Sequence, residues 1–516
     1  MSHALVGSGI ATFIVLAGVM LFWYRKVKVR KQLAVDTFAS FFLGGGDIGN
    51  YLTANNNWGI CFAFANAMWY YAFLGYYYGI YVFLLQIAWS VAVIFLGKYL
   101  TSYLRASKDG TIHGFIGHYY GTRTSLLAAT ATILGYTLNI GFELFYSAHL
   151  LVTSAGIPDY ELMVAVLLAL FVGGYCVVGG YRSSVVTDPM QNWLGVLALL
   201  ILLGLVLPAV YQKSSFHALF SLANTTYPGT SFITGVVVFS LFFNLVDMAN
   251  WQSIAGNRNL PTGQLRSVSI GLYRSAAVQM LAPAALGTLF GAALRLTSPG
   301  IPDDGYFRVA LRPLLAFTAP WQALVLGLVY LGFIGVAISS AGSYLLAAMQ
   351  TLSIDIVKRK ALSSAMNSGG GEDARLKIEQ SVLDWVKRMM IPVCVGMTLI
   401  FALLYDGLSK LNRQGLAFQF QFVMYGAAVT LVPAVLFPLL RQSERRSARA
   451  GFWSIFVGLL CVVVFFAAAE GLWPHLPTLS GMVNSDDIVN LTPLFGLTSS
   501  FCVFVAIERM EARNAR

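Results

Sequence analysis

Apolar segments of about twenty residues recur along the whole chain and alternate with short polar or charged stretches. A helix needs about 20 predominantly apolar residues to cross the hydrocarbon core of a bilayer. We therefore predict a membrane-spanning helix at each such segment. The pattern allows thirteen of them, at about residues 5–24, 51–75, 79–101, 124–154, 160–178, 184–211, 231–256, 267–294, 321–352, 386–405, 416–440, 451–472 and 488–508.

Two of these spans carry polar residues and glycines where a lipid-facing helix would be apolar. The second span follows Gly44–Gly46 and contains three consecutive amides, Asn55–Asn57, and then Gly59. The seventh span contains Asn244 and Asp247. Polar groups that face lipid are costly, so we expect these residues to face protein, water or a ligand and the helices to be interrupted near them.

Interrupted helices at corresponding positions of two five-helix halves are typical of inverted-repeat transporters. The pattern thus predicts an all-α polytopic membrane protein of about 13 transmembrane helices with a core of two inverted five-helix repeats. We expect an additional N-terminal helix and a basic cytoplasmic loop in residues 1–30. The first repeat is expected in residues 31–220, the second in 221–440, and two peripheral helices and a tail in 441–516.

Composition and charge support a membrane protein and fix its expected orientation. The chain is 57% hydrophobic and 11% charged, whereas soluble domains contain roughly 25% charged residues. With the N-terminus outside, 27 of the 33 Lys and Arg residues fall in loops on one side. The positive-inside rule makes that side cytoplasmic, with the C-terminus there and the N-terminus outside. The net charge of +11 is therefore a topology signal, and we expect a cell membrane location and no nucleic-acid partner.

Two adjacent hydroxyls, Ser339 and Ser340, lie in the middle of the apolar stretch Ile334–Met349. Paired hydroxyls near the membrane centre supply oxygen ligands to a small hard cation. The alternative is that they bond to the preceding helical turn and serve packing. Cysteines without CxxC spacing and scattered histidines indicate neither a disulfide framework nor a zinc site.

Three sequence blocks resemble the sodium:solute symporter family, whose members carry proline, sugars, sialic acid, monocarboxylates, urea and vitamins. They are FFLGGGDIG at 41–49, GGYRSSVVTDPMQ at 179–191 and VAISSAGSYLLAAMQTLSIDIVKR at 336–359. The resemblance implies a leucine-transporter-like fold and co-transport of Na⁺ without another cofactor. It also implies a sodium site formed by the hydroxyls of Ser339 and Ser340 and backbone carbonyls at Gly59, Phe62 and Val336.

Asp188 matches an acidic residue that the relatives place near the inner ion path, although an interfacial carboxylate is an equal alternative. Where many relatives have Asp or Asn after the break, this chain has Cys61, and the next small polar position is Ala63. Glu143 is a carboxylate deep in a long span. We expect it either to pair with Arg274, to be a protonated structural acid, or to take part in coupling.

The polar and aromatic residues near the two interruptions are the candidates for contact with a solute. The alternatives are that the amides hold the break open, that the second cluster ends a helix, and that the aromatic residues form an interfacial belt. The candidate substrate-binding residues are Asn56, Asn57, Trp69, Asn244, Asp247 and Trp251.

We therefore predict a sodium-coupled symporter that imports a small polar solute across the lipid bilayer by alternating access. One alternative is a proton-coupled or sodium-independent transporter of the same fold, in which Glu143 or Asp188 cycles a proton. Another is a solute sensor that does not transport, although the sequence adds no signalling domain. Enzyme activity is not expected, because paired catalytic acids, His–Asp clusters and metal-ligand spacings are not seen in or near the spans.

Overall fold

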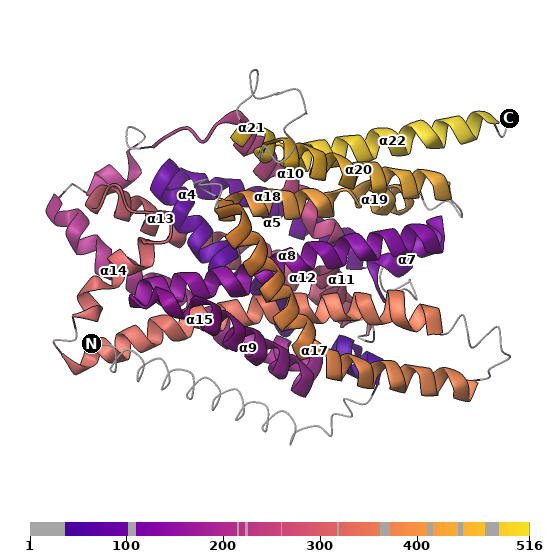
Figure 1. The fold of residues 1–516 in the computed structure, drawn as a ribbon, viewed down its shortest axis with the longest axis horizontal. Coiled ribbons are helices and arrows are strands. Elements are labelled where there is room, and N and C mark those ends of the chain that lie inside the picture. The colour runs from indigo at the N-terminus through magenta and orange to yellow at the C-terminus, as the bar shows by residue number, and fades with distance from the viewer. Residues whose placement is uncertain are drawn as a thin grey trace.

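The computed structural model describes residues 37–101, 110–213, 216–221, 225–257, 259, 261–316, 319–361, 372–409, 416–441, 447–469 and 485–514. Within these ranges the regular elements are helices, and no strand is found. The predicted span at 5–24 and the basic segment that follows it lie outside these ranges. Figure 1 shows long helices running side by side along the longest axis of the molecule.

The first half of the described chain contains long α-helices joined by short 3₁₀ or π-helical turns, which are labelled η. Its elements are α2 (Phe38–Leu43), η1 (Gly44–Gly46), α3 (Asn50–Cys61), η2 (Phe64–Trp69), α4 (Tyr70–Tyr78), η3 (Ile80–Leu85), α5 (Gln86–Phe95), η4 (Leu96–Leu100), α7 (Ile112–Tyr120), α8 (Thr122–Ala155), η5 (Pro158–Tyr160), α9 (Glu161–Lys213) and η6 (Phe216–Phe220).

The second half continues in the same way. Its elements are α10 (Thr230–Val246), α11 (Met248–Ala255), α12 (Thr262–Arg274), η8 (Ser275–Gln279), α13 (Leu281–Thr297), α14 (Tyr306–Leu315), α15 (Pro320–Gln350), η9 (Thr351–Lys358), α17 (Glu372–Ser409), α18 (Leu416–Val429), α19 (Val432–Arg441), α20 (Ala448–Ala469), α21 (Ser485–Asn490) and α22 (Thr492–Asn514).

Helix α9 contains two of the predicted spans. It is divided at Gly180, whose φ of 55° and ψ of −155° are not helical. A Cβ at this position would lie 2.5 Å from the carbonyl oxygen of Phe41, so both the backbone conformation and the packing require glycine. The two parts of α9 correspond to the separate spans predicted at 160–178 and 184–211.

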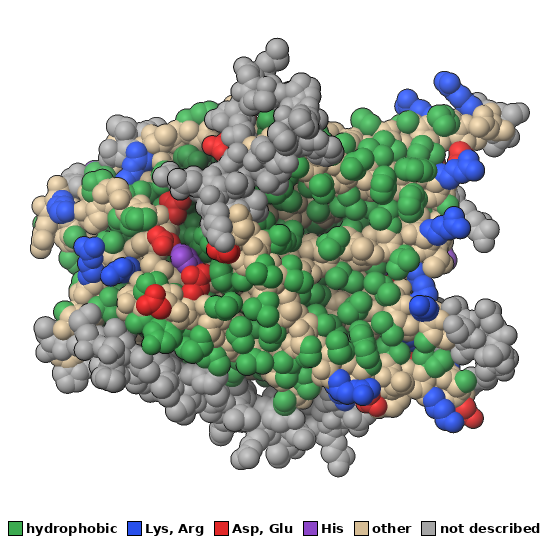
Figure 2. All heavy atoms as spheres, viewed as in Figure 1, with side chains coloured by type: hydrophobic (Ala, Val, Ile, Leu, Met, Phe, Trp, Pro, Cys, Tyr) green, Lys and Arg blue, Asp and Glu red, His purple; other side chains and the backbone are tan. Residues whose placement is uncertain are grey.

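The helices are long and apolar enough to place the chain in a membrane. Within the described residues, eight helices meet the length and hydropathy of a membrane span, or nine if α10 and α11 form one bent span. Figure 2 shows hydrophobic side chains covering the middle of the visible face, with Lys and Arg side chains at the end that holds the C-terminus. The chain is therefore an integral, multi-pass membrane protein.

The first predicted interruption is present, but it lies further along the chain than expected. Helix α3 continues through Asn55–Asn57 and ends at Cys61, after which Phe62 (φ −104°, ψ 88°) and Ala63 (φ −112°, ψ 166°) leave the helical conformation. The three amides do not open the helix because each finds a partner, Asn55 within the helix and Asn56 and Asn57 on other helices. For example, the side-chain amide of Asn55 donates to the carbonyl of Tyr51 at 2.9 Å.

The second predicted interruption lies at Asp247. This residue is extended (φ −73°, ψ 117°) between α10 and α11, and the two helices are bent by 41°. Its carboxylate accepts a hydrogen bond from the backbone N–H of Ala249 at 3.2 Å and so caps α11. An acid that interrupts the apolar pattern is thus the residue that starts a new helix.

Helices α4 and α13 approach each other with almost no side chain between their backbones. A Cβ at Gly75 would lie 2.0 Å from the carbonyl oxygen of Thr288, and a Cβ at Gly291 would lie 2.0 Å from that of Ala72. Small residues permit such close contact between helices in a membrane. This contact joins a helix of the first predicted repeat to a helix of the second.

We expect Gly291→Ala to destabilise the protein, because its added methyl group must displace the backbone of α4. Overpacking of this kind costs about 1–3 kcal/mol. The measurement is thermal unfolding of the purified protein in detergent. Gly204→Ala on α9 is the matched control, since a Cβ there meets no atom within 4 Å. Equal unfolding temperatures for Gly291→Ala and Gly204→Ala would contradict the close contact.

Candidate functional site

The break in the first helix is held by Glu143 from α8. Its Oε1 accepts hydrogen bonds from the backbone N–H groups of Phe64 (2.8 Å) and Ala65 (3.3 Å). Its Oε2 accepts from the backbone N–H of Asn66 at 3.0 Å and from its side-chain amide at 2.9 Å. The carboxylate is fully buried. It satisfies the free N–H groups at the start of the helix formed by η2 and α4, where the helix dipole also favours a negative charge.

The predicted salt bridge between Glu143 and Arg274 is not formed. Arg274 lies exposed at the end of α12, whereas Glu143 is bonded to the helix start at the break. The sequence shows the buried acid but not its partners, because backbone N–H groups leave no trace in the pattern of side chains.

Two predicted ion-site residues, Ser339 and Gly59, meet Asp188, the residue predicted on the ion path, on the other side of the break. The hydroxyl of Ser339 on α15 donates to Oδ1 of Asp188 on α9 at 2.7 Å. Gly59 on α3 lies against both residues, because a Cβ there would be 2.5 Å from Ser339 Oγ and 3.4 Å from Asp188 Cγ. The Asp188 and Ser339 side chains are almost completely buried. Only glycine allows α3 to come this close to α15 and α9.

The other predicted ion-site residues lie beside these three. Val336 and Phe62 both lie against Gly195 of α9, where a Cβ would be 2.4 Å from Val336 Cγ1 and 2.8 Å from Phe62 Cε1. The buried hydroxyl of Ser340 has no hydrogen-bond partner within the described part of the chain. A buried oxygen without a partner is costly, and a bound cation would compensate for it.

Asn56 belongs to the same cluster. Its side-chain amide donates to Asp188 Oδ2 at 2.8 Å and to Ser343 Oγ at 3.2 Å. Its carbonyl oxygen accepts a hydrogen bond from the hydroxyl of Tyr181 at 2.8 Å. Asn56 therefore holds Asp188 in place, although it was predicted as a residue that contacts the solute.

Asn57 connects the two interrupted helices. Its side-chain amide donates to Asn250 Oδ1 at 2.7 Å, and the amide of Asn250 donates to Asn244 Oδ1 at 2.9 Å. Asp247 follows at the second break, where the hydroxyl of Tyr136 donates to its Oδ1 at 2.6 Å. Within the described residues, Oδ2 of Asp247 has no hydrogen-bond partner. Of the six predicted solute contacts, Asn57, Asn244 and Asp247 are thus close to one another.

The two predicted tryptophans lie elsewhere and their indole N–H groups are bonded. Trp69 donates to the carbonyl of Asp303 at 2.7 Å and packs edge-on against Tyr146. Trp251 is buried and donates to the carbonyl of Leu245 at 2.8 Å. Neither residue lines the central cavity described next.

A cavity of about 50 Å³ lies beside the first break and has space for roughly three to five water molecules. Helices α3, α4, α5, α10, α15 and α18 contribute to its wall. Sequence reasoning missed most of these residues, because only the fold brings them together. The lining residues are Ile60, Cys61, Asn66, Tyr70, Tyr71, Leu74, Val82, Phe83, Leu85, Gln86, Trp89, Val236, Phe239, Ser240, Tyr344, Gln421 and Tyr425.

Hydrogen bonds connect this cavity to the break. The amide of Gln421 on α18 donates to Asn66 Oδ1 at 3.2 Å, and Asn66 in turn donates to Glu143. On the opposite wall the hydroxyl of Tyr71 donates to Gln86 Oε1 at 2.9 Å, and the indole of Trp89 donates to Cys61 Sγ at 3.2 Å. The cavity therefore combines aromatic faces with a few oriented amides, a common composition for small-molecule sites.

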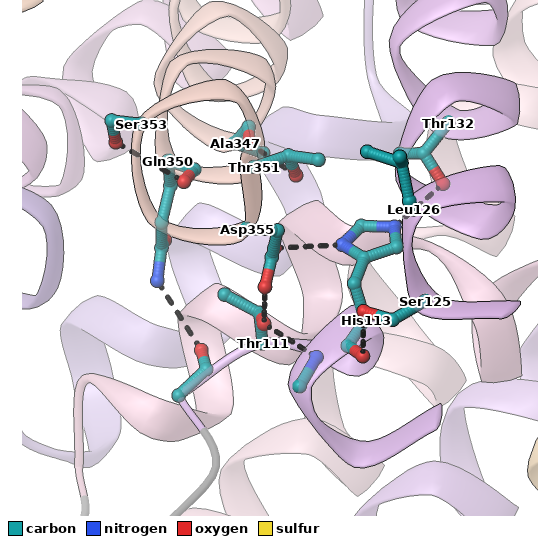
Figure 3. Close-up of polar contacts among 12 residues, drawn as sticks. Thr111, His113, Ser125, Leu126, Thr132, Ala347, Gln350, Thr351, Ser353 and Asp355 are labelled. Atoms are coloured by element: carbon teal, nitrogen blue, oxygen red, sulfur yellow. Dashed lines mark hydrogen bonds and ion pairs between the residues drawn. The ribbon is translucent and has the colours of Figure 1, made fainter. Parts of the chain in front are cut away.

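A second polar cluster lies towards the basic end of the molecule. In Figure 3, Asp355 of η9 points toward Thr111 and His113 at the start of α7, and His113 also reaches Thr132 of α8. Thr111 donates to Asp355 Oδ1 at 2.8 Å, and His113 Nδ1 lies 3.0 Å from Asp355 Oδ2. His113 and Asp355 are both buried. The cluster connects η9, which follows directly after α15, to α7 and α8.

At the opposite end of the molecule, acidic residues pair with His149. Figure 2 shows acidic side chains beside a histidine at this end. His149 Nδ1 lies 3.2 Å from Glu161 Oε2, and His149 Nε2 lies 3.3 Å from Asp304 Oδ2. The hydrogen bond from His149 holds the pKa of Asp304 below its usual range, whereas burial raises the pKa of the adjacent Asp303. These contacts fasten the segment between α13 and α14 to α8 and α9.

Residues 41–250 match the model of the sodium:solute symporter family. This matched range is what links the chain to the family. The matched range contains two of the three blocks that carried the resemblance, at 41–49 and 179–191, and it confirms the predicted resemblance over residues 41–250. A search of curated proteins found no match.

Solved structures of transporters are similar to this protein. A Na⁺-coupled sialic acid symporter superimposes with a TM-score of 0.70 at 13% identity, over 98% of each chain. Mhp1, a nucleobase-cation-symport-1 family transporter, gives a TM-score of 0.47 at 12% identity, over 93% of this chain and 95% of that one. The first similarity confirms the predicted fold, a leucine-transporter-like core of two inverted five-helix repeats.

We expect Asp355→Asn to destabilise the protein, because the buried His113 and Thr111 lose a charged acceptor. A hydrogen bond to a charged group contributes about 1.5–3 kcal/mol, and the loss is measured by thermal unfolding. Asp384→Asn, at an exposed carboxylate on α17, is the control and should unfold like the parent protein. The cluster would have no structural role if both variants unfolded at the parent temperature.

Proposed function

We propose that this protein is a sodium-coupled symporter that imports a small polar organic solute by alternating access. The observation that carries the proposal is the contact of Ser339, Asp188 and Gly59 directly beside a broken helix. The family match over residues 41–250 supports the same function.

The cluster offers the kind of ligands that sodium requires. Na⁺ is a hard cation that binds several oxygen atoms at once, and broken helices supply such oxygens as free carbonyls. The proposed ligands are the hydroxyls of Ser339 and Ser340 and the backbone carbonyls at Gly59, Phe62 and Val336. Asp188 contributes a negative charge next to them, and we place it at the ion site itself as well as on the inner ion path.

The same arrangement provides a physical basis for coupling. A sodium ion bound between α3 and α15 would fix α3 relative to the break, and the break determines where η2 and α4 place Asn66 at the cavity. Each Na⁺ that moves inward gains about 2.3 kcal/mol per 100 mV of membrane potential. This free energy drives solute uptake if Na⁺ and the solute must both be bound before the cavity opens to the other side of the membrane.

We place the solute in the central cavity, with Asn66, Gln86 and Gln421 as polar contacts and Trp89 as an aromatic one. Asn57, Asn244 and Asp247 lie around the adjoining second break and complete the proposed solute region. We assign Asn56 to the ion site because its amide is bonded to Asp188.

A proton-coupled carrier of the same fold is the alternative. One observation favours it: the hydroxyl of Ser339 bonds directly to the carboxylate of Asp188, which is also the residue that would accept a proton. Glu143 is less suited to cycling a proton, because four N–H donors stabilise its ionised form. Solute uptake in sodium-free buffer over a range of pH separates the two mechanisms.

We also propose a cell membrane location with the C-terminus in the cytoplasm. The end of the molecule with α7, η9 and the C-terminal end of α22 carries most of the described Lys and Arg residues, as the positive-inside rule requires of a cytoplasmic side. The segment with Asp303 and Asp304 would then face outward.

We expect replacement of both Ser339 and Ser340 by alanine to raise the half-saturating sodium concentration roughly tenfold or more, because two ligands are lost. The measurement is the rise in unfolding temperature with NaCl, compared with KCl at equal ionic strength. The control is Ser499→Ala on α22, whose hydroxyl bonds only within its own helix. An unchanged sodium dependence in the double variant would exclude this ion site.

We expect Gln421→Ala to raise the half-saturating solute concentration roughly three- to tenfold, because one hydrogen bond in the cavity is lost. A thermal-shift screen of amino acids, carboxylates, urea and sugars, with and without sodium, first identifies the solute. Gln419→Ala on the same helix is the control, since Gln419 donates to Asp486 outside the cavity. If both variants take up solute like the parent, the cavity is not the solute site.

A further inference from the structure

The start of the helix formed by η2 and α4 is the place where a bound anion would be expected. It presents the backbone N–H groups of Phe64, Ala65 and Asn66 in the middle of the membrane protein, next to the cavity. Free N–H groups and the helix dipole bind anions at such a position. In transporters with broken helices these ends point at anionic groups of the substrate.

In this chain the position is already filled by the protein itself. Both oxygens of Glu143 are fully used: Oε1 accepts from Phe64, Ala65 and the hydroxyl of Ser147, and Oε2 accepts twice from Asn66. No N–H group among the first three of this helix is left for a carboxylate that arrives with the solute.

The cavity offers such a carboxylate no other partner. Among its described lining residues none is Lys, Arg or His, and seven of the seventeen are Phe, Tyr or Trp. The nearby charges are negative. Glu143 lies behind Asn66, and Asp247 is bonded to Tyr136, whose ring centroid lies 5.4 Å from that of the lining residue Tyr344. A buried anion without a counter-charge is strongly disfavoured.

We propose that Glu143 takes the place of a substrate carboxylate, so that the cavity binds uncharged or positively charged solutes such as amides, ureas, polyols or amidines. The amides of Asn66, Gln86 and Gln421 provide hydrogen bonds to such groups, and the aromatic faces stabilise a cation. This inference rests on the proposed function in one respect, that the cavity is the solute site.

The first test removes the carboxylate of Glu143 by mutation and adds a free carboxylate to the solution. Glu143→Ala deletes a fragment with the heavy atoms of acetate and exposes the three N–H groups. We expect millimolar acetate, but not acetamide or chloride, to raise the unfolding temperature of Glu143→Ala and to leave the parent unchanged. Asn139→Ala is the matched control on the same helix, because Asn139 contacts the same Asn66 side chain without a charge. Absence of an acetate effect in Glu143→Ala would overturn the proposal.

A second test uses ligands of one shape and three charges, with a variant that preserves the size of the side chain. Benzamidine, benzamide and benzoate are titrated against the parent and Glu143→Gln in the presence of NaCl. We expect the parent to bind benzoate at least tenfold more weakly than benzamide or benzamidine, and Glu143→Gln to shift this ratio toward benzoate. Tighter binding of benzoate than of benzamide by the parent would overturn the proposal even if Glu143→Ala does not fold.

These tests fail separately from the sodium experiment. The acetate effect requires neither transport nor sodium, so it holds even if the Ser339 and Ser340 variants show no change in sodium dependence. Conversely, the sodium site could be confirmed while the parent protein binds benzoate more tightly than benzamide. The proposed symporter function would then stand, and the proposed solute class would be rejected.

Discussion

A helix that stops in the middle of a membrane leaves N–H groups that lipid cannot satisfy, and the rest of this structure depends on how they are satisfied. Phe62 and Ala63 create the interruption, and the carboxylate of Glu143 accepts the N–H groups that follow it. Without that carboxylate several polar groups would be buried without partners, at a cost of about 1–3 kcal/mol each. One acid on α8 therefore sets the position of η2, of Asn66, and of the cavity wall to which Asn66 belongs.

The interruption has two chemically opposite sides. The start of the following helix is electropositive, and the protein fills it with its own acid. The end of α3 is electronegative. It lies against the hydroxyl of Ser339 and the carboxylate of Asp188, so several oxygen atoms lie close together there. A single break thus produces an anion site that is occupied from within and an oxygen-rich site suited to a cation. Asn57 extends this arrangement to the second break through Asn250 and Asn244.

Much of the fold follows from features that a linear sequence displays. Apolar stretches of membrane length, with glycine and asparagine in two of them, were enough to predict the inverted repeats. The meeting of Ser339 with Gly59 was implied by the family resemblance. The exact break was not predictable, because Asn55 bonds within its own helix and Asn56 and Asn57 find partners on other helices. The surroundings of Glu143 were missed for a similar reason, since its partners are backbone groups.

The cavity was the least predictable part. Gln86 and Trp89 lie on α5 and Gln421 lies on α18, and nothing in their local pattern distinguishes them from packing residues until the fold brings them together. The two tryptophans chosen from the sequence, Trp69 and Trp251, instead donate their indole hydrogens to backbone carbonyls. The N–H group of a buried indole needs a hydrogen-bond acceptor. Which acceptor it finds depends on the tertiary structure.

The glycine contacts between α4 and α13 have a consequence for motion. The backbones of α4 and α13 are in contact at Gly75 and Gly291. Few side chains separate the two helices there, so one helix cannot easily slide past the other. Each is preceded by an irregular stretch, Phe62 and Ala63 before η2 and α4, and the π-helical Ser275–Gln279 before α13. We therefore expect α4 and α13 to move as one rigid unit during gating, with those two irregular stretches as hinges.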